Sequence, residues 1–169
     1  NAWTWEHQAL IRARAVTGTR ETMAAFERVR VDILATARDL DKLTDDVCTM
    51  RARMRSELDC SDDDHFDVKQ GVGGIADIEF MVQYAVLRWA SQHPELLAFT
   101  DNLRLLEVLV RLKLFTTDIG SSLHDAYFAY RAEIHRCALQ ESDMLVDRSV
   151  FSEHRNAVER VWRDTFEHH

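Results

Sequence analysis

Lys69, three glycines and the start of a helical pattern lie together in the middle of the chain. Lys69 precedes Gly71, Gly73 and Gly74, and an apolar pattern of helical period begins directly after them. Amides of a tight turn, the positive end of a helix dipole and an ammonium group can together bind an anion. No Gly-Lys-Ser or Gly-Lys-Thr follows the glycines, so this is not a nucleotidase-type phosphate loop. The alternative is a turn that only packs a strand against a helix.

Two acidic residues follow in the predicted helix. Asp77 falls in its first turn, where the helix dipole and unpaired amides favour a carboxylate, and we expect it to act as a helix-start residue. Glu79 lies inside the apolar stripe, and a buried carboxylate needs a cation or several donors. We expect Glu79 to be mostly buried and paired with Arg12 or Arg131. A direct role of Glu79 in a composite active site is the other interpretation.

The remaining polar clusters are poor candidates for metal binding or catalysis. The acidic stretch 61–65 reads as an exposed connection and lacks the ligand pattern of a calcium loop. His124 and His135 return to one helix face, but Arg131 lies between them and disfavours a bound cation. No serine or cysteine fits a strand–turn–helix nucleophile motif. We therefore expect neither metal ligands nor catalytic residues within this chain.

Composition narrows the class of protein. The formal charge of −8 argues against nucleic acid or an anionic membrane as the main partner. Three cysteines without CxxC spacing favour a reducing, cytoplasmic location over a disulfide framework. No run of eighteen apolar residues and no signal-peptide layout is present, which predicts a chain that is not exported.

Five glycines and one proline in 169 residues favour helices. We predict an all-α bundle of about six or seven helices in one domain, residues 1–169, with one short extended segment and a glycine turn near 66–74. Apolar spacing predicts a central helix at about 74–91 and others at about 2–16, 21–37, 44–58, 103–112, 123–139 and 151–166. Arg51, Arg53 and Arg55 of the third helix are expected on a solvated face, and residues 116–122 with Gly120 in a turn.

Several strings resemble segments of bacterial glutamine synthetase adenylyltransferases. The motif is FDVK at residues 66–69, GGIADIEF at 73–80 and VQY at 82–84. AWTWEHQAL at 2–10 with RAR at 12–14, TDN at 100–102 with RLLE at 104–107, and HRCALQ at 135–140 resemble other segments of the family in the same order. The resemblance therefore covers nearly the whole chain.

The resemblance implies an enzyme with two similar halves, one attaching AMP from ATP to a tyrosine of glutamine synthetase and one removing it by phosphorolysis. The AWTWEH and DIEF strings look more like the AMP-attaching half. The family's metal-binding aspartates lie in a Gly-Ser-Asp-x-Asp motif that this sequence lacks. The chain, which opens without methionine, is expected to be the helical part that packs on the catalytic sheet of a longer enzyme, and His168 and His169 are either native or a tag.

The implied cofactors are Mg²⁺ and ATP in the full-length enzyme, with none expected on this chain alone. The implied partners are the catalytic nucleotidyltransferase domain of the same chain, glutamine synthetase and the PII signalling protein. Two alternatives stay open. One is the helical domain of the related PII-uridylyltransferase, and the other is a stand-alone interaction module with no part in catalysis.

Overall fold

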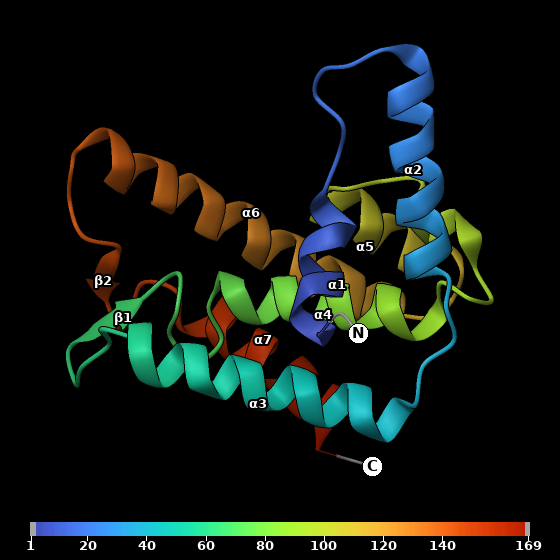
Figure 1. Cartoon of the computed structure of the whole chain (residues 1–169). Coiled ribbons are helices and arrows are strands. Elements are labelled where there is room, and N and C mark those ends of the chain that lie inside the picture. Colours follow the sequence, from blue (N-terminus) through green and yellow to red (C-terminus); the bar gives the residue numbers. More distant parts are fainter. Residues whose placement is uncertain (1–2, 168–169) are drawn as a thin grey trace.

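The computed structural model describes residues 3–167 and shows an all-α bundle with a very small sheet, as predicted (Figure 1). The described residues form seven α-helices, one 3-10 helix and two strands, in the order α1 Thr4–Arg12, α2 Arg20–Leu34, α3 Leu40–Leu58, β1 His65–Asp67, α4 Ile75–Trp89, the 3-10 helix Pro94–Leu97, α5 Asn102–Arg111, α6 Thr117–Leu139, β2 Leu145–Asp147 and α7 Ser152–Phe166.

Helix α4 is the centre of the bundle, which confirms the prediction from its apolar pattern. Twelve of its 15 residues are buried, and it contacts α1, α3, α5, α6 and α7. Figure 1 shows α4 crossing the middle of the molecule, with α3 and α6 on different sides and α2 projecting from the bundle. A helix that is apolar around most of its circumference is stable only when other helices cover it, and here five helices do so.

Side-chain caps set several helix ends, and they correct the predicted boundaries. Asp39 accepts a hydrogen bond from the Lys42 amide, so α3 begins at Leu40, earlier than the predicted residue 44. Asp101 caps α5 in the same way, because its side chain accepts a hydrogen bond from the Arg104 amide. Helix α1 ends at Arg12, shorter than the predicted 2–16, because Ala13 has extended backbone angles. Residue 2 lies outside the described part.

The predicted turn at 116–122 is wrong, because α6 already begins at Thr117. The Thr116 hydroxyl accepts from the Ile119 amide and caps the helix. Gly120 lies within α6 and lets it approach α5, since a Cβ on Gly120 would lie 2.2 Å from Val110 Cγ2. Gly120 is therefore a close-packing residue of a helix and not a turn residue.

The extended segment before the glycine turn pairs with a second strand that the sequence pattern did not indicate. Strand β1 pairs antiparallel with β2, placing His65 opposite Asp147 and Phe66 opposite Val146. The Val68 amide continues the pairing by donating to the Met144 carbonyl. This two-stranded ribbon fixes the chain that leads into the turn before α4.

Candidate functional site

The glycine turn is closed by hydrogen bonds within the chain. Its amides donate to nearby acceptors, Gly71 to the Asp67 carbonyl, Gly74 to the Gly71 carbonyl, and Gly73 to Asp77 Oδ2 at 2.7 Å. The first amide of α4, that of Ile75, donates to the Val68 carbonyl. These amides have no free hydrogen for an anion, which corrects the expectation that the turn amides are available to a ligand.

The turn needs glycine because it is tightly enclosed. Gly73 has φ of +79°, and a Cβ there would lie 2.5 Å from Arg155 Cγ and 2.7 Å from the Arg155 carbonyl oxygen. A Cβ on Gly71 would lie 2.6 Å from the Asp67 carbonyl oxygen. Gly71, Gly73 and Gly74 are all buried, whereas Lys69 is exposed. Of the four predicted residues, only Lys69 is thus placed to meet a ligand.

Asp77 joins the turn to α3 through a buried ion cluster. Arg51 Nε donates to Asp77 Oδ1 at 2.6 Å, and Arg55 Nη2 donates to both carboxylate oxygens at 2.8 and 3.0 Å. Arg51 also donates to the Gln70 carbonyl at 2.8 Å. The side chains of Arg51 and Asp77 are 1% and 2% exposed. Asp77 is therefore more than the expected helix-start residue, and the expected solvated face holds only for Arg53, whose side chain is 71% exposed.

Glu79 pairs with Arg12, one of the two predicted partners. Arg12 Nη1 donates to Glu79 Oε1 at 3.0 Å, and Asn102 Nδ2 and the Tyr127 hydroxyl donate to the same oxygen at 3.1 and 3.4 Å. Burial raises the pKa of Tyr127, which keeps its hydroxyl protonated as a donor. Arg131 instead stacks over the Tyr127 ring, 5.9 Å from its centroid.

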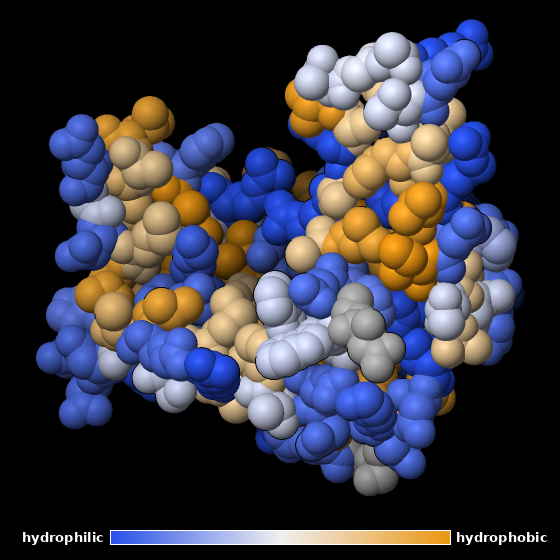
Figure 2. All heavy atoms as spheres, in the orientation of Figure 1, coloured by the Kyte–Doolittle hydropathy of each residue, from blue (hydrophilic) through white to orange (hydrophobic). Residues whose placement is uncertain are grey.

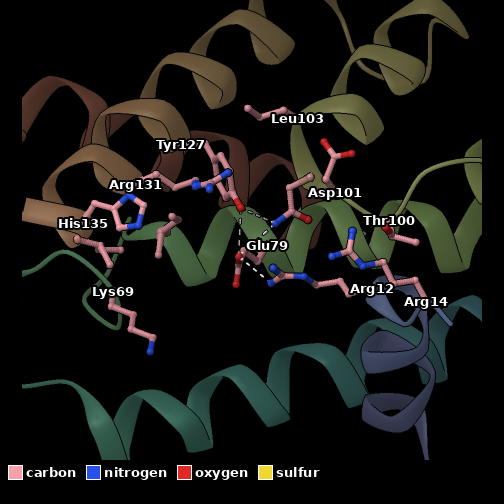
Figure 3. Close-up of a pocket in the computed structure, with 13 residues that line it drawn as sticks. Arg12, Arg14, Lys69, Glu79, Thr100, Asp101, Leu103, Tyr127, Arg131 and His135 are labelled. Atoms are coloured by element: carbon pink, nitrogen blue, oxygen red, sulfur yellow. Dashed lines mark hydrogen bonds and ion pairs between the residues drawn. The ribbon is translucent and has the colours of Figure 1, made fainter. Parts of the chain in front are cut away.

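Glu79 is less buried than predicted. Its side chain is 25% exposed and that of Arg12 is 49% exposed. Water therefore reaches the pair. Glu79 therefore forms the floor of an open groove, shown in Figure 3 with its bonds to neighbouring side chains.

The cationic groove lies over the N-terminal half of α4 and has a volume of about 610 Å³. Figure 2 shows this face hollowed between α6 and the projecting α2, with hydrophilic side chains gathered in the hollow. Its lining residues come from α1 and the segment after it, the glycine turn, α4, α5 and α6: Arg12, Arg14, Lys69, Ile75, Glu79, Thr100, Asp101, Asn102, Leu103, Tyr127, Arg131, Ile134 and His135.

Positive charge exceeds negative charge in the groove, although the whole chain is acidic. Four permanent cations face two carboxylates, Glu79 and Asp101. Among residues 3–167, the Lys69 ammonium and the Arg14 guanidinium have no hydrogen-bond or ion-pair partner. In Figure 3, Arg14 lies on the α1 side of Glu79, while Lys69 lies below His135. Unpaired cations around a concave surface favour an anionic ligand.

The structure also places the other candidate groups. His135 lines the groove, whereas His124 contacts Asp125 at 3.2 Å and does not line it. Within the described residues, no group of three or more His, Cys, Asp or Glu side chains could hold a metal ion. No helix within residues 3–167 is long and apolar enough to cross a membrane.

Comparison with protein families gives two matches in different parts of the chain. Residues 48–168 match the family model described as GlnD PII-uridylyltransferase. Residues 1–29 match the model described as glutamate-ammonia ligase adenylyltransferase. The first match contains the glycine turn, α4 and the α5–α6 side of the groove, and the second contains Arg12 and Arg14.

Curated relatives match nearly the whole chain. The bifunctional glutamine synthetase adenylyltransferase/adenylyl-removing enzyme of Pseudomonas aeruginosa is 48% identical over 96% of this chain, and that of Nitrosococcus oceani is 50% identical over 95%. A third, from Thioalkalivibrio sulfidiphilus, is 46% identical over 98% of the chain. The chain spans 17–18% of the length of these relatives. It belongs to the glutamine synthetase adenylyltransferase family, and its helical part from residue 48 onward shares a family model with PII-uridylyltransferases.

Proposed function

We propose that this chain is the helical part of an enzyme that attaches AMP from ATP to a tyrosine of glutamine synthetase, with a second half that removes it. The observation that carries the proposal is identity of 46–50% over nearly the whole chain to enzymes named for both reactions. The proposal includes the PII signalling protein as a regulator and the cytoplasm as location. The three cysteines, which are all free, are compatible with that location.

In this proposal the cationic groove faces the catalytic nucleotidyltransferase domain of the same enzyme. Lys69 and Arg14 then donate hydrogen bonds to the phosphates of ATP and offset the charge that develops on them during transfer. ATP supplies the adenylyl group. Magnesium is held by the other domain in this proposal, because the sequence lacks the Gly-Ser-Asp-x-Asp motif that carries the family's metal-binding aspartates. The glycine turn holds Lys69 in place and does not bind the phosphates through its own amides.

Turnover of the full-length enzyme tests the role of the groove. Lys69→Ala and Arg14→Ala should each lower AMP transfer at saturating ATP by about tenfold, with little change in melting temperature, because both side chains are exposed. Arg160→Ala is the matched control, since Arg160 is an exposed cation of α7 that does not line the groove. If the Lys69 and Arg14 variants keep wild-type turnover, the groove does not take part in transfer.

This chain alone is expected to transfer no AMP, because phosphoryl-type transfer needs metal ions and the sequence lacks the Gly-Ser-Asp-x-Asp motif that binds them in the family. The assay incubates it with Mg²⁺, ATP and glutamine synthetase and counts AMP on the protein. Transfer above a control without the chain would contradict this expectation.

The family match over residues 48–168 supports a second candidate, the helical domain of a PII-uridylyltransferase. Both candidates transfer a nucleotidyl group to a protein and differ in nucleotide and target. Offering the full-length enzyme ATP with glutamine synthetase, and UTP with PII, separates them. Labelling of PII alone would favour the second candidate.

A further inference from the structure

An apolar strip runs beside the cationic groove along the seam between α5 and α6. Leu103 lines the groove and also two shallower hollows of about 420 and 330 Å³. One hollow continues to Val110 and Gly120, and the other to Phe128 and Ala132. We call these five residues the α5–α6 track. The groove and the track thus form one continuous surface.

Phe128 gives the main indication that the track is a binding surface. Its side chain is 65% exposed, although a phenylalanine gains most from burial. Arg131, Ala132 and His135 follow it at spacings of three, four and seven residues, so all four lie on one face of α6. An exposed aromatic residue beside an arginine is typical of protein interfaces, in which phenylalanine and arginine are enriched.

The size and charge of this surface favour a polypeptide over a small molecule. The groove of about 610 Å³ is itself large enough for a drug-sized ligand, which leaves the track uncovered. Arg131 and His135 line both the groove and the hollow around Phe128. A segment lying on the track would therefore have apolar side chains on Phe128 and Leu103 and carboxylates near the Arg131 guanidinium.

We propose that the α5–α6 track binds an acidic segment of the protein substrate that carries aromatic or aliphatic side chains, and guides its tyrosine toward the groove. This inference rests on the proposed function, because the protein substrate is glutamine synthetase. The track supplies affinity for the protein, and the unpaired cations of the groove act on the nucleotide. Track and groove variants therefore affect different substrates.

Direct binding is the first test. Glutamine synthetase is immobilised, and this chain is passed over it in a surface plasmon resonance experiment. Phe128→Ala should weaken binding about tenfold, as expected for truncation of a central aromatic contact. Leu139→Ala is the matched control, because Leu139 lies on the same helix, is 85% exposed and lines neither the groove nor the track. Absence of wild-type binding, or equal weakening by both variants, overturns the proposal.

Kinetics of the full-length enzyme form the second test. Phe128→Ala should raise KM for glutamine synthetase about tenfold and leave KM for ATP unchanged. A rise in KM for ATP alone would show that the track holds the base of the nucleotide, which overturns docking of the protein. If the wild-type enzyme transfers AMP but Phe128→Ala alters neither KM, the track proposal alone is wrong. If the wild-type enzyme transfers no AMP, the proposed function is wrong as well.

Discussion

Replacing Asp77 with alanine should be among the most destabilising single changes in this chain. The substitution leaves Arg51 charged and enclosed, with a side chain only 1% exposed. Removing one partner of a buried ion pair costs about 3–5 kcal/mol. Arg55 adds little to that cost, because its side chain is 28% exposed and can be hydrated. We therefore expect Asp77→Ala to lower the free energy of unfolding by about 4 kcal/mol.

The measurement is chemical and thermal denaturation followed by circular dichroism. In a chain of this length, 1 kcal/mol shifts the melting temperature by about 2–4 °C, so the expected shift is about 10 °C. Glu57→Ala is the matched control, because the Arg53–Glu57 pair of α3 is 71% and 59% exposed and should contribute under about 0.5 kcal/mol. Adding Arg51→Met to Asp77→Ala removes the unpaired charge and should recover part of the loss. A loss below about 1 kcal/mol for Asp77→Ala would refute this account of the cluster.

Three further predictions concern the packing around this centre. Glu79→Ala should cost only about 1 kcal/mol in denaturation experiments, because its partner Arg12 is half exposed, and a loss equal to that of Asp77→Ala would contradict this. Gly120→Ala should destabilise the chain despite the better helix propensity of alanine, since its Cβ would overlap Val110, and Val110→Ala should relieve the overlap in the double variant. Burial raises the pKa of Tyr130 above its ordinary value of 10, so the unfolded chain loses this proton first, and unfolding free energy should fall above about pH 10 and less steeply in Tyr130→Phe. Equal slopes in both proteins would contradict the last prediction.

The sequence predicted what depends on repeated apolar spacing or on a short local motif. Helix α4 was predicted because its apolar residues cover most of its circumference. A pairing of Glu79 with Arg12 or Arg131 was also predicted, since a carboxylate within an apolar stripe requires a cation. The partial exposure of the Glu79 side chain was not predicted, because it depends on how α1 packs against α4.

The wrong predictions concern contacts between distant segments. Asp77 lies where many helices carry an acidic residue in their first turn. This position in the sequence does not reveal that its carboxylate binds Arg51, which is 26 residues away. In the sequence Gly120 resembles a turn residue, and only the structure shows that it packs against Val110 of α5. Strand β2 has only three residues, which is too short for an alternating pattern. The groove likewise combines side chains from four helices and the segments between them, and these elements are far apart in the sequence.

The glycine turn can present Lys69 because its three glycine amides and its contacts with α3 hold the backbone in place. Arg51 binds both Asp77 and the Gln70 carbonyl, and Asp77 binds the Gly73 amide, so α3 holds the turn against the start of α4. A rigid turn loses little conformational entropy when a ligand binds, so a cation fixed on it acts more effectively than one on a mobile loop. The buried ion cluster and the exposed cation are therefore parts of one arrangement. Substitutions in the cluster should be read first as changes in stability, and those at Lys69 as changes in binding.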